Sequence, residues 1–543
     1  MGTCGVAAGA GEIEGLIRQE LENRQLAAEI VPVGCIGMCF REPLVDIQLP
    51  GQPRVTYSNV KPEMVPRLID EHLVQGRIVP GLALGQLATN HGTVSQPIAD
   101  ADLPEYAEMP FYRKQIRIAL RNCGMLNPEN IEEYLAGDGY RGLHKALTEM
   151  TPDEVIEEIK DSGLRGRGGA GFLSGVKWEF CRRSRNPKKY VICNADEGDP
   201  GAFMDRSILE GDPHSVIEGM AIAGYAIGAQ EGYIYCRAEY PLAIAHLKTA
   251  LAQAHEYGLL GKNILGADFS FDLRVYEGAG AFVCGEETAL MASIEGRRGE
   301  PRPRPPFPAV SGLWNKPSNV NNVKSYAMTP EIIRRGADWF AGIGAPKSPG
   351  TAIFALTGQI NNTGLIEVPM GITLREFIYD VGGGIPHGKT FKAVQTGGPL
   401  GGCLPASALD TPVDFASSVL AWATMGSGGM IVVDESTCMI EFAKYFLTFA
   451  SAESCGKCVP CRLGGQRLLE VLTRISEGNG VPSDLEEIEY ISRNMQQSSL
   501  CALGQLTPGP VMAALRFFRE EYEAHIYHKK CPAKVCKALI NYS

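Results

Sequence analysis

Three closely spaced cysteines and a distant fourth restrict the fold of this chain more than any other feature. Cys455, Cys458 and Cys461 are separated by two residues each, and Cys501 lies in a later Ser-Leu-Cys-Ala-Leu-Gly segment. Three thiolates at this spacing can wrap one corner of a metal cluster while a fourth closes it, as in a cubane [4Fe–4S]. A Cys₄ zinc site is the alternative, but such sites more often use two separate C-x₂-C pairs. The spacing therefore favours [4Fe–4S] and electron transfer.

A glycine-rich segment in the middle of the chain predicts a phosphate site. Residues 162–172 read SGLRGRGGAGF and follow an amphipathic stretch, 151–160, that we expect to be a helix. Backbone N–H groups of glycines can approach a phosphate, and Arg165, Arg167 and Lys177 add positive charge. The segment is neither a Walker A loop nor a clean dinucleotide fingerprint, so a flexible linker is the alternative.

Two acidic turns follow apolar strands and are expected to converge on this loop. The first strand begins at Tyr190 and runs into Asn194, Asp196 and Glu197. The second begins near Phe271 and leads to a turn with the sequence Gly285-Glu286-Glu287. Ligands of α/β sheets bind beyond the carboxyl ends of strands, and carboxylates suit ribityl and ribose hydroxyls. Flavin mononucleotide (FMN) with a nicotinamide nucleotide fits this set, whereas carboxylates that merely cap helices near Pro200 and Glu287 are the alternative.

Composition and charge exclude several classes of protein. A net charge of −11 argues against a nucleic-acid-binding surface. Sixteen cysteines in 543 residues are too dilute for a disulfide scaffold, and no charged-then-apolar signal segment opens the sequence, so we expect a cytoplasmic protein. No apolar run reaches the roughly 18 residues that a membrane span needs.

Six motifs in order resemble the NADH-binding flavoprotein subunit of respiratory complex I. The resemblance is greater still to its relatives, the diaphorase subunits of NAD-linked, often electron-bifurcating, [FeFe] hydrogenases and formate dehydrogenases. It extends over about residues 110–525. The motifs are Ser162–Phe172, Cys193–Glu197, Gly285–Ala289, Pro305–Trp314, Asn321–Asn322 and Glu453–Cys458.

The resemblance implies which residues bind the cofactors. The positions that match FMN-binding residues of the family are Gly166, Gly168, Gly169, Lys177, Asn194, Asp196, Glu197, Gly285, Glu286, Asn321 and Asn322. The positions that match residues around the nicotinamide nucleotide are Phe172, Lys177, Glu197 and Glu287. Arg167, Asp199 and Phe282 are further candidates in the same segments. Hydride transfer to a flavin needs no acid, base or nucleophile from the protein, so no catalytic side chain is predicted.

Two positions depart from the family. Phe282 stands where relatives often have tyrosine, which removes a hydroxyl but leaves an aromatic ring for stacking. Asp199 stands where complex I subunits usually have glutamate. An acidic side chain near the adenosine ribose would repel a 2′-phosphate, so NAD is favoured over NADP.

Composition shifts and the resemblance together predict a multidomain α/β protein. We expect a thioredoxin-like [2Fe–2S]-type module (1–90), a linker (91–110) and a Rossmann-like FMN/NADH-binding α/β domain (111–345). A β-grasp, soluble-ligand-binding-like domain (346–436) contains short β runs and one helix from Thr373 to Val381. A helical bundle with the [4Fe–4S] ligands (437–524) and a tail (525–543) complete the plan.

The first residues contain part of a second cluster motif. Cys4, Cys35 and Cys39 resemble the thioredoxin-like [2Fe–2S] module of the same complexes, which uses two cysteines near its start and two later ones. The chain begins inside this motif, so either the sequence is trimmed or the cluster is degenerate. Three thiolates alone do not hold [2Fe–2S] well without a fourth ligand.

The last residues contain a possible zinc site. Cys531 and Cys536, with either His525 or His528, have metal-like spacing and need a fourth ligand from elsewhere. Two unpaired tail cysteines are the alternative. The remaining cysteines lack a companion at ligand spacing and are expected to pack as small apolar side chains; they are Cys123, Cys181, Cys193, Cys236, Cys284, Cys403 and Cys438.

The sequence thus predicts a diaphorase subunit that passes electrons between NAD(H), FMN and iron–sulfur clusters in a soluble complex. The expected partners are an iron–sulfur catalytic subunit, from a hydrogenase or a formate dehydrogenase, and a small [2Fe–2S] thioredoxin-like subunit. Electron bifurcation is left open. A complex I subunit is the first alternative, although complex I usually carries the thioredoxin-like module on a separate chain. The second is a non-catalytic scaffold that has lost its flavin.

Overall fold

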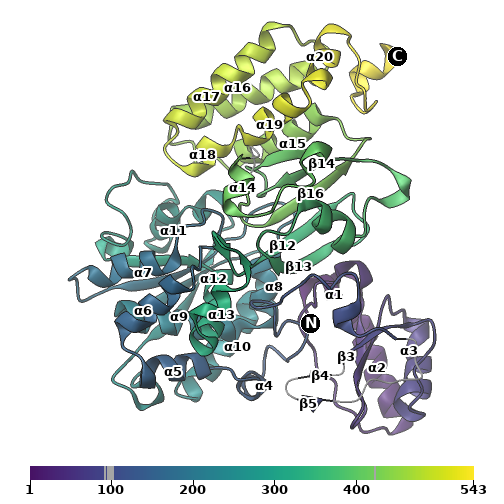
Figure 1. Ribbon diagram of the computed structural model, residues 1–543, viewed down its shortest axis with the longest axis vertical. Helices are drawn as coiled ribbons and strands as arrows, with labels where there is room; N and C mark the ends of the chain where they lie inside the picture. Colours follow the sequence, from purple (N-terminus) through teal and green to yellow (C-terminus); the bar gives the residue numbers. More distant parts are fainter. Residues whose placement is uncertain (88, 91–92, 95–102, 421–423, 543) are drawn as a thin grey trace.

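The computed structural model describes residues 1–87, 89–90, 93–94, 103–420 and 424–542. Figure 1 shows an N-terminal module (purple) beside a large α/β region (teal), followed by a mixed sheet (green) and a helical bundle (yellow) at the opposite end. Half of the predicted linker at 91–110 lies outside the described residues. Its last part is ordered, and Tyr106 is buried against Tyr112.

The N-terminal module is a small antiparallel sheet packed against helices. Strand β2 lies between β1 and β3. Ile13 and Leu21 of a helix share one apolar core with Val55 and Tyr57 of β2. Its elements are α1 (Thr3–Ala7), α2 (Ala10–Arg24), β1 (Val45–Ile47), β2 (Arg54–Tyr57), α3 (Val65–Arg67), a π-helical continuation (Leu68–Val74) and β3 (Ala83–Leu87).

A four-stranded parallel sheet forms the centre of the α/β region, in the order β8-β7-β6-β9. The strands are β6 (Tyr190–Ala195), β7 (Glu231–Arg237), β8 (Asp272–Gly278) and β9 (Ser318–Asn322). Alternate residues of β6 point to opposite faces because side chains alternate along a strand. Val191 and Cys193 pack against the helical layer, whereas Tyr190 and Ile192 pack on the side of the cluster cysteines.

The helices of this region connect and cover the strands. The predicted helix at 151–160 is confirmed as α6, and its capping box is formed by Thr151 and Glu154. The helices are α4 (Ile131–Ala136), α5 (Arg141–Glu149), α6 (Pro152–Asp161), α7 (Ser174–Arg183), α8 (Met204–Gly211), α9 (Pro213–Ile227), α10 (Pro241–Glu256), α11 (Glu287–Ile294), α12 (Val323–Arg335) and α13 (Ala337–Ala341).

The mixed five-stranded sheet has the order β13-β12-β16-β14-β15, and only β12 and β16 pair in parallel. The three predicted β runs are confirmed as β12, β13 and β16. The predicted helix ends at Val381 as expected, although its last part, Glu376–Val381, is π-helical. The strands are β12 (Thr351–Gly358), β13 (Gly364–Pro369), β14 (Phe391–Thr396), β15 (Gly402–Pro405) and β16 (Gly429–Asp434), and α14 spans Phe415–Leu420.

The bundle carries the predicted cluster cysteines at the ends of its helices. Its core contains Phe446, Leu468, Leu472 and Ile488, which come from three different helices. The helices are α15 (Met439–Ala452), α16 (Val459–Ser476), α17 (Ser483–Ser498), α18 (Ala502–Leu506), α19 (Gly509–Phe517) and α20 (Arg519–Tyr527). Two short strand pairs, β4/β5 (Thr89–Asn90, Thr93–Val94) and β10/β11 (Gly344–Ala345, Ser348–Pro349), complete the described strands. None of the helices in the described part of the chain combines the length and the apolarity that crossing a membrane requires.

Candidate functional site

The parallel sheet has a topological switch point between β6 and β9. The chain adds β7 and then β8 on one side of β6, and afterwards returns to pair β9 on the other side. Ligands of such sheets bind beyond the carboxyl ends of the strands at this point. Asn194 is paired with Asn322 at the ends of these two strands, and Asp196 follows β6 directly. The sheet therefore brings together side chains that the sequence predicted to converge.

The glycine loop lies on this switch point as a closed turn. The Gly166 N–H donates to the carbonyl of Phe172 (2.8 Å), and the loop leads into α7. A Cβ atom on Gly168 would lie 3.0 Å from Cβ of Asn322, and Gly169 has a φ of +120°, which favours glycine. The loop is thus packed against the end of β9, unlike a flexible linker, and a side chain at Gly168 would make an unusually tight contact with Asn322.

Asp196 is the one acidic residue of the two turns whose carboxylate is buried without a hydrogen-bond partner among the described residues. Both of its oxygens lack a partner, and burial raises the pKa of Asp196 to about 7. Buried polar groups in native proteins are almost always satisfied, so an orphaned carboxylate indicates a missing ligand. Gly285 approaches it, since a Cβ on Gly285 would lie 3.9 Å from Asp196 Oδ2. A glycine cradle beside an unpaired acceptor fits the phosphate and ribityl hydroxyls of FMN.

Glu197 and Glu286 instead cap helices, as the alternative interpretation expected. The Glu197 carboxylate accepts from the backbone N–H groups of Met204, Asp205 and Arg206 at the start of α8. Glu286 accepts from the N–H groups at the start of α11. Burial raises the pKa of Glu197 to about 7. These two side chains hold the turns in shape.

The cations around the loop have partners within the protein. The ammonium of Lys177 lies 2.8 Å from Glu287, which also pairs with Arg304 at 2.9 Å. The Arg167 guanidinium is buried and donates to the carbonyls of Thr351 and Pro349, so it connects the loop to the mixed sheet. Arg167 was predicted to add charge near a phosphate, and the structure turns its side chain toward these carbonyls.

The other predicted binding residues differ in exposure and in their partners. Phe172 is 52% exposed, which leaves its ring available for stacking. Asp199 is hydrogen-bonded to the Ser427 hydroxyl, and burial raises its pKa to about 6. Asn321 is satisfied inside the protein, because its Oδ1 accepts from the indole of Trp178 (3.0 Å). Asn194 donates to the carbonyl of Gly285 (2.9 Å), which ties the two acidic turns together.

A buried ion pair beside the site escaped the sequence analysis. Lys324 and Asp205 lie 2.9 Å apart, both almost fully buried, and Asn322 donates to the same carboxylate. Lys324 lies two positions after Asn322. A lysine so close to the Asn321-Asn322 motif was the sequence signal that could have indicated a charge beside the site. Its partner comes from α8, which no local pattern connects with β9.

The four cysteines of the bundle surround one small cavity. Cys458 precedes the first turn of α16 and Cys501 precedes α18, so helix starts aim both toward the cavity. Its lining consists of Val283, Pro301, Ser454, Cys455, Lys457, Cys458, Cys461, Leu500, Cys501 and Leu503. Among the described residues, the groups whose ligand atoms all lie within 4.8 Å of one another do not include these cysteines. One tetrahedral zinc needs sulfurs about 3.8 Å apart, since Zn–S bonds are about 2.3 Å, so the wider spread suits a cubane.

Three contacts attach this cavity to the acidic turn of the α/β region. The Phe282 N–H donates to Glu453 (2.8 Å), and the Phe282 ring packs against Phe449. Arg298 donates to the carbonyl of Cys455 (2.9 Å). Val283 lines the cysteine cavity while Gly285, two residues later, approaches Asp196. A single short turn therefore separates the predicted flavin site from the predicted cluster site.

At the C-terminal end, the structure brings together Cys438, His525, Cys531 and Cys536, all buried, with ligand atoms within 4.8 Å of one another. His525 Nδ1 lies 2.7 Å from the Glu521 carbonyl and Nε2 lies 3.3 Å from Cys536 Sγ. Cys438 packs in the apolar core of the bundle, as expected, and also lies beside His525 and the tail cysteines, because α15 begins next to α20 and the tail. His528, the other candidate, is exposed.

In the N-terminal module, Cys4, Cys35 and Cys39 also lie within 4.8 Å of one another. The hydroxyl and N–H of Thr3 donate to Glu210 at the end of α8, at 2.5 and 2.8 Å. The same helix begins at the Glu197 turn, so it connects the two sites.

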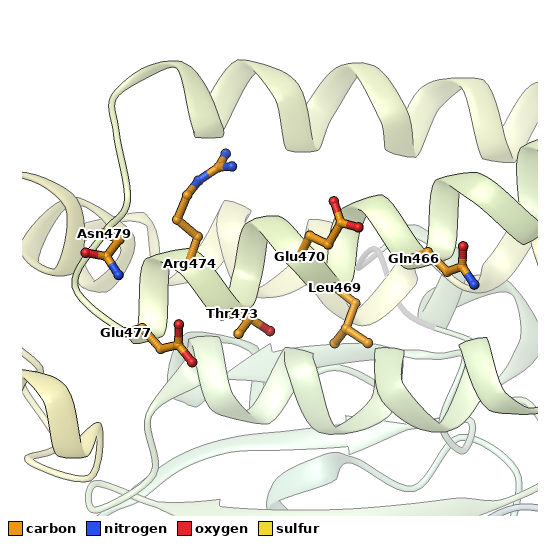
Figure 2. Close-up of a pocket in the computed structure, with 7 residues that line it drawn as sticks. All are labelled: Gln466, Leu469, Glu470, Thr473, Arg474, Glu477 and Asn479. Carbon is orange, nitrogen blue, oxygen red and sulfur yellow. The ribbon is translucent and has the colours of Figure 1, made fainter.

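The lining of a separate groove on the bundle includes none of the predicted site residues. It runs along α16 and has a volume of 590 Å³ (Figure 2). Two of its charged residues have partners: Arg474 pairs with Asp484, and Glu470 pairs with Arg467. It offers no cluster of unpaired polar groups that would indicate a cofactor.

Comparison with known proteins identifies the two central parts of the chain. Residues 159–331 match the family described as Nuo51 FMN-binding domain, and residues 441–525 match the NADH-ubiquinone oxidoreductase-F iron-sulfur binding region. These ranges contain the orphaned Asp196 and the four cluster cysteines, respectively.

Individual relatives cover most of the chain. It is 58% identical over 431 residues to the NADP-reducing hydrogenase subunit HndC of Solidesulfovibrio fructosivorans, spanning 79% of this chain and 88% of that protein. It is 47% identical over 415 residues to the F 2 subunit of the NADH-quinone oxidoreductase of Rhizobium meliloti, spanning 76% of this chain and 99% of that protein. The structure of an NAD⁺-reducing [NiFe]-hydrogenase in its H₂-reduced state superimposes with a TM-score of 0.68 at 27% identity, covering 96% of this chain and 83% of that one. The chain therefore belongs to the family of NADH-binding oxidoreductase subunits that carry FMN and a [4Fe–4S] cluster, which includes the NADH-binding subunits of complex I and the diaphorase subunits of hydrogenases.

Proposed function

We propose that this chain is the electron-input subunit of a cytoplasmic hydrogenase or formate dehydrogenase complex, and that its nucleotide is NAD(H) rather than NADP(H). The observation that carries the proposal is the short turn from Phe282 to Gly285, which contacts the cysteine cavity on one side and Asp196 on the other. When bound, FMN accepts hydride from the nicotinamide and passes electrons singly to iron–sulfur centres. The role of the protein is to bind and orient FMN and the nicotinamide nucleotide and to hold the iron–sulfur centre near the flavin.

Each part of the cradle has a proposed role in binding. The backbone N–H groups of Gly168 and Gly169 hold the FMN phosphate, because those of Gly166 and Arg167 donate to Phe172 and Ser325, and Asp196 accepts hydrogen bonds from ribityl hydroxyls. Phe172 stacks against the nicotinamide nucleotide from the exposed side of the opening. Asp199 disfavours a 2′-phosphate, because burial and its contact with Ser427 keep it from moving aside. HndC is named as a subunit of an NADP-reducing hydrogenase. The proposed preference for NAD(H) therefore differs from the nucleotide in that relative's name.

The four parts of the fold are proposed to be the domains that the sequence suggested. The antiparallel N-terminal module (1–90) is assigned as thioredoxin-like, the parallel sheet region (111–345) as Rossmann-like, and the mixed sheet (346–436) as β-grasp. The helical bundle (437–524) houses the cluster. The fused N-terminal module favours a hydrogenase-type or formate-dehydrogenase-type complex over complex I.

Isolation of the native complex tests the proposed partners. An affinity-tagged chain, purified anaerobically from its source cells, is expected to bring with it an iron–sulfur catalytic subunit and a small [2Fe–2S] subunit. Formate- or hydrogen-dependent reduction of NAD⁺ by the isolated complex identifies the catalytic subunit. Co-purification of membrane-embedded subunits with quinone reduction would instead support the complex I alternative. Coupled reduction of a low-potential acceptor together with NAD⁺ would establish bifurcation.

The C-terminal cysteines and histidine are proposed to bind zinc. Three thiols and one imidazole within 4.8 Å form a Cys₃His set, which suits a structural tetrahedral zinc site. The Glu521 carbonyl accepts from Nδ1 of His525 and leaves Nε2 for the metal. The site would fasten the tail to the start of α15.

Elemental analysis of variants tests the zinc proposal. His525→Ala is expected to lose zinc and to make the tail sensitive to protease, whereas His528→Ala, its exposed neighbour, is expected to keep the metal. Protein that contains no zinc although it never met a chelator would contradict the proposal.

A further inference from the structure

A serine in the cysteine loop contacts one of the proposed cluster ligands. Ser454 Oγ lies 3.2 Å from Cys461 Sγ, and the same oxygen accepts from the Gly456 N–H at 3.2 Å. Ser454 lies two residues after the end of α15, and Cys461 lies in the first turn of α16, so two helix ends fix the contact. Among the described residues it is the one side-chain hydrogen bond to the sulfur of a cluster cysteine.

The direction of this hydrogen bond follows from the chemistry of the ligand. A cysteine that binds iron is a thiolate and has no proton to donate. The Ser454 oxygen already accepts from Gly456, and its own hydrogen is free to donate. With a cluster held by the four proposed cysteines, the Ser454 hydroxyl is therefore the donor and Cys461 Sγ is the acceptor.

The cations of the loop donate to carbonyls instead of to this sulfur. Lys457 donates to the carbonyl of Pro301 at 2.8 Å, and Arg462 donates to the carbonyl of Gly456. Their charges are thus held at the backbone on either side of the cavity. The hydroxyl of Ser454 is left as the side-chain group that acts directly on a ligand.

The contact lies in a part of the bundle from which water is largely excluded. Cys461 and Cys501 are each 8% exposed, and hydrogen bonds are electrostatically stronger at low dielectric. The buried Ser499 lies on the same side, since a Cβ on Gly504 would be 2.7 Å from Ser499 Oγ and 2.8 Å from Cys461 Cβ. The Ser499 hydroxyl has no hydrogen-bond partner among the described residues. Because buried hydroxyls are almost always paired, it indicates an acceptor that a bound cluster supplies beside Cys461.

We propose that Ser454 is a positioning residue for electron transfer, whose hydrogen bond to the Cys461 thiolate raises the reduction potential of the [4Fe–4S] cluster. The inference rests on the proposed ligand set and on the proposed passage of electrons from FMN to this cluster. Reduction adds one negative charge to the cluster, and a hydrogen bond to a ligand sulfur stabilises that charge. The hydroxyl keeps its proton, so only one electron moves. Ser454 thereby favours electron transfer from the flavin.

Electron paramagnetic resonance (EPR) during a redox titration of the anaerobically purified 543-residue chain tests the proposal. Ser454→Ala should lower the affinity of the cluster for its electron about tenfold, which is a shift of about 59 mV to more negative potential. Its iron content should stay at the wild-type value. Ser454→Thr keeps the hydroxyl and should keep the wild-type potential. Ser498→Ala is the matched control, because Ser498 is exposed and donates to the Asn494 carbonyl of its own helix.

Electron–nuclear double resonance of the reduced cluster detects the donated hydrogen itself. Spectra in H₂O and D₂O should show an exchangeable proton that wild type and Ser454→Thr share and that Ser454→Ala lacks. If Ser454→Ala assembles too little cluster, Ser454→Val replaces it, because valine and threonine have the same shape and differ in the hydroxyl.

The results separate this inference from the proposed function. A wild-type potential in both hydroxyl-free variants, or the same exchangeable proton in them, overturns the role of Ser454 and leaves the ligand set intact. Wild-type protein without a [4Fe–4S]⁺ signal overturns the ligand set and this inference with it.

Discussion

Replacing Asp196 by asparagine should change flavin binding and apoprotein stability in opposite directions. The Asp196 carboxylate is buried and neither oxygen has a partner among the described residues. In the flavin-free protein the charge on Asp196 therefore lowers the free energy of unfolding. In the FMN-bound protein the same carboxylate accepts hydrogen bonds from ribityl hydroxyls. Asparagine keeps the size of the side chain and removes the charge, so the substitution isolates these two effects.

The stability effect follows from the pKa of Asp196, which burial raises from 3.8 to about 7. A shift of about three units corresponds to about 4 kcal/mol at 1.36 kcal/mol per unit. Because the folded-state pKa is raised, the penalty is absent below the unfolded pKa and complete above the folded one. The free energy of unfolding of wild-type apoprotein thus falls between about pH 4 and about pH 7. The advantage of Asp196→Asn should grow by about 2.5 kcal/mol between about pH 5 and about pH 8.

The binding effect has the opposite sign. Hydrogen bonds to a charged group contribute about 1.5–3 kcal/mol, so Asp196→Asn should weaken FMN binding roughly 10- to 150-fold. Flavin fluorescence titration of the apoprotein measures this change. The same protein preparation serves for both measurements.

Urea unfolding of flavin-free protein, followed by tryptophan fluorescence, measures the stability effect. Trp178 donates to Asn321 beside the site, so its emission reports on this region. Asp268→Asn, an exposed aspartate of the same region, is the control and should shift neither quantity. Equal destabilisation of Asp196→Asn at both pH values, or unchanged FMN affinity, would show that this carboxylate is not an unpaired flavin ligand.

Three further predictions concern the cofactors. Cys458→Ser should abolish the [4Fe–4S]⁺ EPR signal and electron delivery to the partner while flavin content is kept, and Cys403→Ser should not; an unchanged signal would refute the ligand set. Lys177→Ala should weaken FMN retention by about 1.5–3 kcal/mol in a fluorescence titration, because it removes the cation beside the loop and leaves Glu287 with one partner fewer. An unaltered dissociation constant would count against a role for this lysine. NADH should bleach the flavin faster than NADPH in stopped-flow measurements, and Asp199→Ser should gain rate with NADPH; equal wild-type rates with both nucleotides would reject the nucleotide assignment.

Local sequence was sufficient wherever function depends on neighbouring residues. The spacing of Cys455, Cys458 and Cys461 predicted the iron–sulfur region because one loop and one helix start hold all three. Gly168 and Gly169 predicted a close approach of backbone: a Cβ on Gly168 would lie 3.0 Å from Cβ of Asn322, and the φ of +120° at Gly169 favours glycine. The capping box of α6 and the apolar strand β6 are likewise properties of short segments.

Roles within the acidic turns needed the tertiary structure. Asp196, Glu197 and Glu286 are similar in sequence, yet two of them cap helices and, of these three described residues, Asp196 alone is left unpaired. Which carboxylate caps depends on where α8 and α11 begin relative to the strands. The role of Arg167 could not be predicted from local sequence either, because its guanidinium donates to the carbonyls of Thr351 and Pro349, which come much later in the chain.

The sequence by itself determined which chemistry this protein can support, through the composition and spacing of its cysteines, glycines and acidic residues. The tertiary structure alone decided which distant residues lie together: Cys438 beside His525, and Lys324 beside Asp205. The physical reason is that metal and cofactor sites require donors within a few ångströms of one another. Such distances are set by the packing of helices and sheets, which spacing along the chain does not encode.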